Sequence, residues 1–255
     1  MNFENQKSTK KSLGIIGFGS FGMLIARHVG RYFDISAYDT SSGLTNRAAE
    51  LGVTLTSLQA VAQCDVIILA TPVSRCADVV TSIAPFCRAG ALVLDVGSVK
   101  VQPCEVMERI LPGHVDIVAT HPLFGPESAR DGIKGLKIAI CPIRGFRHRQ
   151  LAAFLHTQLG LQVIETTPDE HDREAATVQG LTHLIAKVLL DMKPLPTLMT
   201  TRSFDLLVEA ISMVQNDAPE VFDAIETANP YAPDVRRRFF RLASKLNLAL
   251  EKPGE

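Results

Sequence analysis

The sequence predicts an α/β fold, in which a doubly wound and mostly parallel sheet is followed by an all-α C-terminal part. Short apolar runs alternate with helix-like patterns from residue 12 to about residue 165. The runs at 66–70 and 91–95 are apolar on both faces, as parallel strands are when helices cover both sides of a sheet. After residue 166 only helical patterns continue.

The alternation predicts eight strands joined by helices. The predicted strands are 12–17, 34–38, 53–55, 65–70, 91–95, 115–119, 136–140 and 161–165. The predicted helices between them are 20–31, 43–51, 57–63, 74–84, 99–110 and 146–159. Alternation of this kind is typical of strand–helix–strand units in a parallel sheet.

The second half of the chain opens with a strong helix start. Thr167 can cap the helix, Pro168 suits its first turn and Glu170 completes a capping box. We expect this helix to reach about residue 192, where prolines follow. The further predicted helices are 201–215, 217–228 and 231–250.

These patterns divide the chain into a sheet domain, residues 1–165, and a helical domain, residues 166–255. The helical domain is small for an independent core, so we expect it to pack against a second copy in a homodimer. We expect no regular structure in residues 1–10 or in the last five residues.

The most informative stretch is a glycine-rich turn between the first predicted strand and helix. Its residues are Gly17, Phe18, Gly19, Ser20, Phe21 and Gly22. The first glycine permits a tight turn, the second lets the backbone approach a pyrophosphate, and the third lets helix and strand pack closely. The free N–H groups and the dipole of the helix favour an anion there. The sequence therefore predicts a Rossmann-type dinucleotide site, although a purely structural glycine turn is the alternative.

Asp39 ends the next predicted strand and bears on the choice of cofactor. An acid at this position accepts hydrogen bonds from the adenosine ribose and repels the 2′-phosphate of NADP. The sequence therefore favours NAD. Hydroxyl groups at 40–42 could still bind a phosphate, so NADP stays open.

Composition limits the class of protein. The net charge of −1 gives no basic field for nucleic acid or an anionic membrane surface. The five cysteines are irregularly spaced and without a CxxC pair, which is typical of reduced thiols. The polar N-terminal residues do not resemble a signal peptide, and no run is long enough to span a membrane. We expect a soluble, cytoplasmic protein without a metal site, since no cluster has metal-ligand spacing.

Candidate reactive groups follow the predicted strands, where ligands bind in an open α/β sheet. Thr71 and Pro72 follow one strand, Ser98 follows the next, and His121 follows the strand at 115–119. Imidazole titrates near neutrality and can take a proton from an alcohol while hydride leaves the same carbon. We predict that His121 is catalytic and that Ser98 holds its ring or the substrate hydroxyl. A loop histidine satisfied by the backbone is the alternative.

The helix predicted from 168 carries Gln179 and His183 on one face, four residues apart. A histidine in such apolar surroundings is more often a buried hydrogen-bonding residue than a catalyst. We interpret His171, next to Asp172 near the helix start, as structural.

Four segments in this order, GFGSFG, DVGSVK, THPLFGPES and HD…QGLTH, resemble the prephenate/arogenate dehydrogenase family, and most of all its short, plant-type arogenate dehydrogenases. The resemblance runs from about 12 to 215. It implies a Rossmann domain with a helical dimerisation domain, and oxidation of a cyclohexadienol ring: hydride passes to a nicotinamide, carbon dioxide leaves, and the ring becomes aromatic. It makes His121 the catalytic histidine, Ser98 its partner and His183 a substrate-pocket histidine, with Gln179 as a plausible neighbour.

The resemblance also bears on the substrate. Prephenate-preferring members have an arginine that binds the side-chain carboxylate, and aligning the phenylalanine of the segment at 203–209 puts Glu209 at that position. Glutamate there would repel the keto acid of prephenate and attract the ammonium of arogenate, and Glu127 would add to the effect. We therefore predict arogenate as substrate, with prephenate or dual specificity as the alternative. Plant-type relatives tend to use NADP, and Asp39 departs from their pattern.

Two other functions remain open. Another two-domain reductase, such as a β-hydroxyacid dehydrogenase or an imine reductase, would be expected to carry lysine or aspartate on the interdomain helix. That face here carries Gln179 and His183, with Lys187 one turn on. A non-catalytic NAD-binding sensor is the other alternative, and the pair Ser98 and His121 argues against it.

Overall fold

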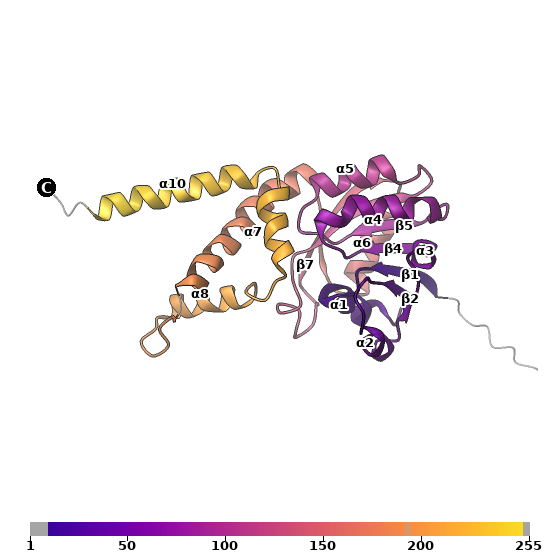
Figure 1. Ribbon diagram of the computed structural model, residues 1–255, viewed down its shortest axis with the longest axis horizontal. Coiled ribbons are helices and arrows are strands. Elements are labelled where there is room, and N and C mark those ends of the chain that lie inside the picture. Colours follow the sequence, from indigo (N-terminus) through magenta and orange to yellow (C-terminus); the bar gives the residue numbers. More distant parts are fainter. Residues whose placement is uncertain (1–9, 193, 252–255) are drawn as a thin grey trace, which may run out of the picture.

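A single eight-stranded sheet organises the first two thirds of the chain (Figure 1). The structure is a computed structural model and describes residues 10–192 and 194–251. The strands are β1 Lys11–Ile16, β2 Phe33–Tyr38, β3 Thr54–Leu55, β4 Val66–Leu69, β5 Leu92–Asp95, β6 Asp116–Pro122, β7 Lys137–Arg144 and β8 Gln162–Glu165. Their order in the sheet is β3-β2-β1-β4-β5-β6-β7-β8. All eight predicted strands are thereby confirmed, and the predicted fold class is correct.

Every neighbouring pair is parallel except β6 and β7, which are antiparallel. The register places Ile16 opposite Leu69, Leu69 opposite Asp95, and Asp95 opposite Ala119. The carboxyl ends of β1, β4, β5 and β6 therefore meet at one edge of the sheet, where ligands bind in such folds.

Helices cover both faces of the sheet. Helices α1 (Ser20–Val29), α2 (Thr45–Glu50) and α6 (His148–Thr157) pack on one face, and α3 (Leu58–Ala62), α4 (Cys76–Ile83) and α5 (Val101–Ile110) on the other. Adjacent strand residues serve opposite faces: Ile67 joins the core under α3, α4 and α5, whereas Ile68 joins the other core. Burial on both faces explains why these strands are apolar throughout.

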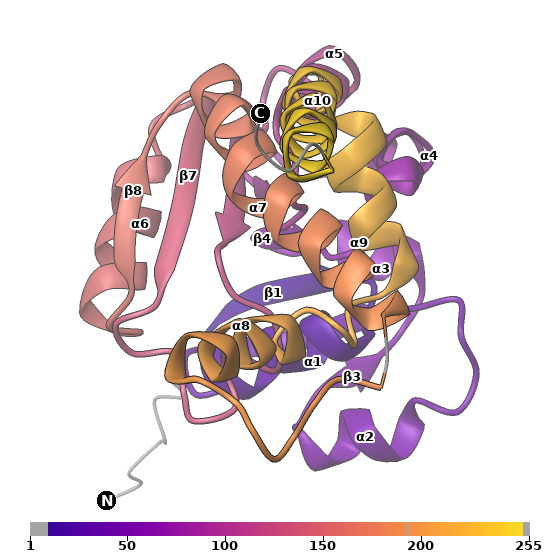
Figure 2. The same ribbon diagram turned by 90° about the vertical axis from the view of Figure 1, so that its left-hand side faces the viewer.

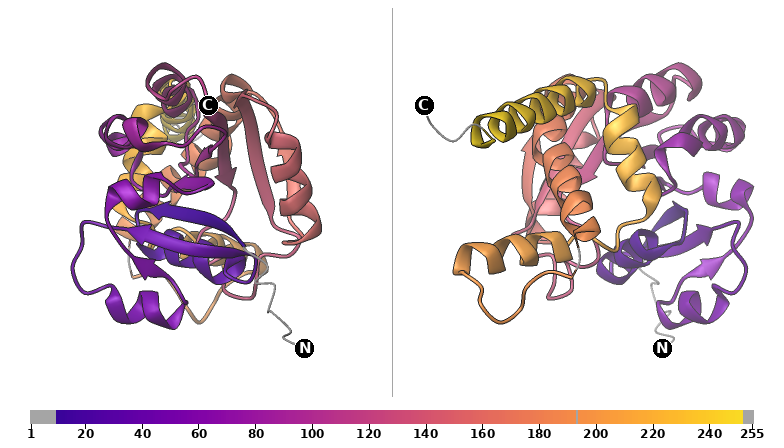
Figure 3. Two further views of the ribbon diagram at one scale, coloured as in Figure 1. Left: turned by 90° about the vertical axis from the view of Figure 1, so that its right-hand side faces the viewer. Right: turned by 60° about the vertical axis from the view of Figure 1, so that its left-hand side comes forward.

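Four helices follow the sheet: α7 (Pro168–Asp191), α8 (Arg202–Ser212), α9 (Pro219–Asp223) and α10 (Ala232–Leu250). Helix α7 begins with the predicted capping box, in which the Thr167 hydroxyl accepts from the Glu170 N–H and the Glu170 carboxylate accepts from Thr167. Figure 2 shows α7 crossing beside the sheet, and Figures 1 and 3 show α10 projecting away from it.

The observed helices differ from the predicted ones in detail only. The segment predicted at 74–84 starts as a 3₁₀ turn, Val73–Arg75, before α4, and the segment predicted at 217–228 ends as a π-helical turn, Ala224–Ala228. The predictions for the chain ends lie almost wholly outside the described residues. Within 10–192 and 194–251, no helix is both long and apolar enough to cross a bilayer.

Candidate active site

The glycine turn has the geometry that a dinucleotide site requires. Gly17 has a φ of +95°, and its N–H donates to the Tyr38 carbonyl at 2.9 Å. A Cβ at Gly17 would lie 2.5 Å from the Ala70 carbonyl oxygen, and one at Gly22 would lie 2.2 Å from the Gly17 carbonyl oxygen. Both positions therefore exclude a side chain, which brings α1 tightly against β1.

The start of α1 is open to an anion. Gly19 precedes the helix without any side-chain cap, and nothing lies within 4 Å of where its Cβ would be. Gly19 and Ser20 are exposed, Phe21 is half-buried, and the Phe18 side chain is fully buried beneath them. Phe18 therefore anchors the turn, while the first N–H groups of α1 face free space.

Asp39 and Thr71 lie beside this turn. One Asp39 oxygen accepts from the Phe18 N–H at 2.6 Å and the other accepts from the Ser41 N–H at 2.8 Å. The Thr71 nitrogen lies 3.0 Å from the position of a Gly17 Cβ, and the exposed Pro72 follows it. The predicted cofactor-binding residues are thus brought together at the ends of β1, β2 and β4.

His121 and the glycine turn follow the same row of paired residues across the sheet. This row is Ile16–Leu69–Asp95–Ala119; the turn begins one residue after Ile16, and His121 comes two residues after Ala119. Three strand spacings separate the first residue of the row from the last, or about 14 Å. The histidine is thus placed at the far side of the crevice from the pyrophosphate turn.

A chain of hydrogen bonds orients the His121 ring. Its Nδ1 lies 2.8 Å from Nε2 of His171, and Nδ1 of His171 lies 2.8 Å from Oδ1 of Asp172. The Asp172 carboxylate also accepts from the backbone N–H groups of Lys100 at 2.7 Å and Val101 at 2.9 Å. Because the Asp172 carboxylate only accepts, His171 donates to it from Nδ1, and its Nε2 can then accept from the Nδ1–H of His121. The Nε2 of His121 is left with a free lone pair and can act as a base.

That lone pair faces Gln179. The amide nitrogen of Gln179 lies 3.3 Å from Nε2 of His121, so the amide donates to it. The Oε1 of Gln179 is buried without a hydrogen-bond partner among the described residues. Gln179 was predicted to line the substrate pocket, and the structure brings it into contact with His121.

Burial keeps His121 neutral. Only 4% of the residue is exposed, and desolvation lowers its pKa well below the usual 6.5, with the Lys100 ammonium lowering it further. Lys100 is fully buried: its Nζ donates to the Thr120 carbonyl at 2.7 Å and pairs with the Asp95 carboxylate. A buried ammonium this close favours an imidazole that stays unprotonated until a substrate proton arrives.

Two expectations about these neighbours change. His171, interpreted as structural from its position near the helix start, is in direct contact with His121. Ser98 is half-buried and, within the described part of the chain, makes no hydrogen bond to His121, because His171 takes the ring nitrogen that a partner would use. A contact of Ser98 with the substrate hydroxyl stays a prediction. The HD dipeptide was the only sequence signal for His171.

His183 marks a second group of polar side chains, one turn along α7 from Gln179. His183 is buried, its Nε2 lies 3.8 Å from the Asp217 carboxylate, and its ring is close to Phe222. Burial raises the pKa of Asp217, and the exposed Glu127 raises it further by repulsion. Burial and the nearby Lys187 lower the pKa of His183. Asp217, which sequence reasoning missed, therefore lies close to His183 and within electrostatic range of Glu127.

Glu209 lies outside the two groups of polar side chains around His121 and His183. It is exposed on α8, and no contact joins it to His121, Gln179 or His183 among the described residues. The alignment that placed Glu209 in the substrate pocket therefore has no support in the geometry. The acidic group near His183 is Asp217, eight residues further on.

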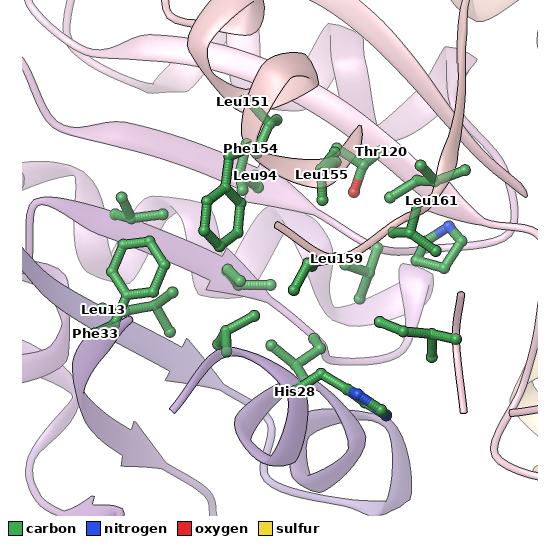
Figure 4. Close-up of a pocket in the computed structure, with 18 of the residues that line it drawn as sticks. Leu13, His28, Phe33, Leu94, Thr120, Leu151, Phe154, Leu155, Leu159 and Leu161 are labelled. Carbon is green, nitrogen blue, oxygen red and sulfur yellow. The ribbon is translucent and has the colours of Figure 1, made fainter. Parts of the chain in front are cut away.

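An apolar cavity of about 240 Å³ lies on the opposite face of the sheet, between α1 and α6 (Figure 4). Thr120 and Pro122 line it, and the chain alternates, so His121 between them points to the other face. Its walls are mostly leucine, phenylalanine and isoleucine side chains, and neither His121 nor Gln179 lines it. The cavity is thus separate from the candidate active site.

Comparison with known proteins gives the family. The family model described as "Prephenate dehydrogenase, nucleotide-binding domain" matches residues 24–142. Arogenate dehydrogenase 1, chloroplastic, of Arabidopsis thaliana is 31% identical over 91% of this chain and 38% of its own length. The chain belongs to the prephenate/arogenate dehydrogenase family. The family match begins just after the glycine turn, so the turn is assigned to nucleotide binding by its own geometry.

Other members of the family agree. The probable arogenate/prephenate dehydrogenase of Methanocaldococcus jannaschii is 25% identical over 94% of this chain and 57% of its own. The crystal structure of prephenate dehydrogenase from A. aeolicus with hydroxyphenyl propionate and NAD+ has a TM-score of 0.76 at 22% identity and covers 96% of this chain and 92% of that one. That similarity shows the fold. The chain spans 38% and 57% of the first two curated relatives that it matches.

Proposed function

We propose that this family member is an NAD-dependent dehydrogenase that converts arogenate to tyrosine by oxidative decarboxylation. The observation that supports this best is the state of His121: a neutral, buried imidazole, oriented by His171 through Nδ1, whose Nε2 is contacted by the Gln179 amide, at the end of the sheet that carries the glycine turn. A base held in this way suits removal of a proton from a ring hydroxyl. We assign residues 1–165 as the nucleotide-binding domain and 166–255 as the substrate and dimerisation domain.

Different residues of this chain would bind the cofactor and remove the proton. The N-terminus of α1 and the turn at 17–22 would hold the pyrophosphate, and Asp39 the ribose. Bound NAD would supply the hydride acceptor. His121 Nε2 accepts the proton of the ring hydroxyl, and the imidazolium that forms is stabilised through His171 by the Asp172 carboxylate.

The preference for arogenate is supported by Asp217 and not by Glu209. Asp217 is half-buried beside His183, and its repulsion from Glu127 leaves these two carboxylates short of a positive partner. The side-chain ammonium of arogenate would relieve that shortage, whereas the keto acid of prephenate would add another negative group. The relatives include enzymes named for either substrate and a cyclohexadienyl dehydrogenase, so the assay must include both.

NAD is preferred to NADP because both Asp39 oxygens are held at the turn by backbone N–H groups. A carboxylate fixed there stands where a 2′-phosphate would have to lie. Relatives named for NADP exist in the family, so the comparison of kcat/KM for the two cofactors is informative.

A homodimer through the helical part is supported by α10. Its exposed leucines include Leu242, Leu246 and Leu250, which repeat every fourth residue and are 52%, 61% and 74% exposed. Such a stripe on a projecting helix is typical of a face that packs against another helix. Light scattering coupled to gel filtration is expected to give twice the chain mass, and charged substitutions at these leucines to give the monomer.

The test is an absorbance assay at the NADH band with arogenate or prephenate and NAD or NADP. We expect the highest kcat/KM with arogenate and NAD. Equal or faster turnover of prephenate would contradict the substrate assignment, and a preference for NADP would contradict the role of Asp39. NAD binding without turnover of either ring substrate would favour a sensor in place of an enzyme.

A further inference from the structure

The position of Gln179 indicates a role in the chemistry of the candidate site. It lies on α7, whereas His121 lies on β6, so the contact joins the helical part to the sheet. Its amide nitrogen is directed at the one ring nitrogen of His121 that no other described residue contacts. Its Oε1 is buried without a partner in the described part of the chain, which is costly in a folded protein unless a ligand completes the site.

The distance between the two nitrogens has a geometric consequence. His121 Nε2 and Gln179 Nε2 are 3.3 Å apart. This separation allows one oxygen atom to lie at an ordinary hydrogen-bond distance of about 2.8 Å from both nitrogens. Such an oxygen would donate its proton to the His121 lone pair and accept a hydrogen bond from the Gln179 amide.

We propose that Gln179 is a catalytic residue that donates a hydrogen bond to the reacting oxygen of the substrate. This inference rests on the proposed function and adds a second group to its chemistry. In the absence of substrate, the amide takes the place of the hydroxyl on His121. When the ring hydroxyl binds, the amide transfers its hydrogen bond from the imidazole to that oxygen.

The reaction balances with this assignment. The hydroxyl proton passes to His121 Nε2, the hydride passes from the same carbon to the nicotinamide dinucleotide, and the C–O bond gains double-bond character. Negative charge develops on the oxygen as its proton leaves, and the Gln179 N–H stabilises it without itself changing covalently. A fixed donor aimed at that oxygen lowers the barrier because the charge is larger in the transition state than in the bound alcohol.

The decisive variant is Gln179→Met, which keeps the length of the side chain and removes both amide atoms. We expect kcat with the better ring substrate to fall about 10²-fold, which is the usual effect of losing one such donor. Substrate deuterated at the transferred position should show a larger isotope effect on kcat than it does with the wild type, because the chemical step becomes slower. The dissociation constant for NAD should be unchanged.

The pH profile gives a readout that a structural role would not move. In the free enzyme the Gln179 amide donates to Nε2 and so favours neutral His121. Its removal should raise the pKa of His121 and shift the acid limb of kcat/KM to higher pH. Gln179→Asn retains the amide on a shorter side chain and should recover part of kcat. It also serves as the test if the methionine variant does not fold.

Gln162→Met is the matched control, since it makes the same chemical change at an exposed residue of β8. It should behave as the wild type. Wild-type turnover in Gln179→Met, or a loss of turnover with an unchanged isotope effect and an unchanged acid limb, would overturn the assignment of Gln179. A wild-type enzyme that turns over neither ring substrate would instead refute the proposed function.

Discussion

The two ends of the candidate active site are built in different ways. The nucleotide end comes from one continuous stretch, in which the turn at 17–22 and Asp39 are joined by backbone hydrogen bonds. The substrate end is assembled from β6, from α7 and from the loop before α9, which contribute His121, Gln179 and Asp217. The nucleotide end depends on backbone shape, whereas the substrate end depends on the docking of two parts of the chain.

Of the substitutions that test this difference between the two ends, removal of the base His121 should have the largest effect on kcat. His121→Asn keeps a polar side chain but has no group that accepts a proton near neutral pH. We expect kcat to fall by about 10² to 10⁴-fold, the usual contribution of a general base. NAD binding, measured by isothermal titration calorimetry, should persist because the glycine turn is built separately. Loss of NAD binding as well would show that the two ends are not independent.

A substitution at the nucleotide end should act through the backbone. Gly17→Ala places a Cβ 2.5 Å from the Ala70 carbonyl oxygen at a φ of +95°. Strain of this kind costs about 1–3 kcal/mol, and the accompanying clash adds to it. We expect a lower urea midpoint and weaker NAD binding. Gly43→Ala is the control, because Gly43 also has positive φ but nothing lies within 4 Å of its Cβ position. Equal losses in both variants would mean that the contact with Ala70 is unimportant.

Loss of the imidazole that orients His121 should reduce kcat less than loss of His121 itself. His171→Phe removes the acceptor for the Nδ1–H of His121 while it keeps a buried ring. We expect kcat to fall about 10- to 100-fold, since the base stays present but is no longer oriented. Pre-steady-state and steady-state rates would separate this effect from substrate binding. A rate within error of the wild type would return His171 to the structural role that the sequence suggested.

Asp217→Asn should shift specificity and leave the chemistry intact. Loss of the carboxylate removes a favourable charge for arogenate and an unfavourable one for prephenate. We expect the ratio of kcat/KM for arogenate to that for prephenate to fall about tenfold, which corresponds to about 1.4 kcal/mol. Glu209→Gln, on the exposed face of α8, should leave the ratio unchanged. If only the Glu209 variant changes the ratio, the original alignment was right and the reassignment to Asp217 is wrong.

Protein stability should depend on pH through His121. Burial lowers the pKa of this residue below 6.5, so the unfolded chain binds its proton at a higher pH than the folded chain does. The free energy of unfolding should therefore decrease as the pH falls from 6.5 to the native pKa, by at most about 1.4 kcal/mol per pH unit. Urea titrations of the wild type and of His121→Gln at several pH values should show that the free energy of unfolding changes less steeply with pH in the variant. Identical slopes would mean that the native site accommodates the imidazolium.

The sequence predicts most of the fold because its signals are local. The apolar runs fix the strands, and the capping box at Thr167 fixes the start of α7 within one residue. The turn at 17–22 is recognisable for the same reason, since glycine is required wherever a Cβ would strike the neighbouring backbone. His121 is found because the sequence places it near the carboxyl end of a strand, at the edge where ligands bind; the strand predicted at 115–119 in fact continues to Pro122 and includes His121.

The substrate end is harder to predict because its contacts join distant parts of the chain. His171 is 50 residues from His121 and Gln179 is 58, so no spacing rule links them. Asp217 lies in a loop that has no periodicity, and its closeness to His183 depends on how α7 and α9 pack. The assignment of Glu209 rests on one phenylalanine in a helix whose exposed face carries the glutamate, and it stays a prediction.

The Asp172 carboxylate serves two structures at once. One of its oxygens contacts the imidazole of His171, and together its two oxygens accept from the N–H groups that begin α5, a helix of the sheet part. A hinge motion that pulls α7 away from α5 would take the Lys100 and Val101 N–H groups from this carboxylate, and in the same step it would take His171, on α7, away from His121 on β6. The base would then lose its orientation whenever the crevice opens. Proton removal is therefore confined to the closed molecule.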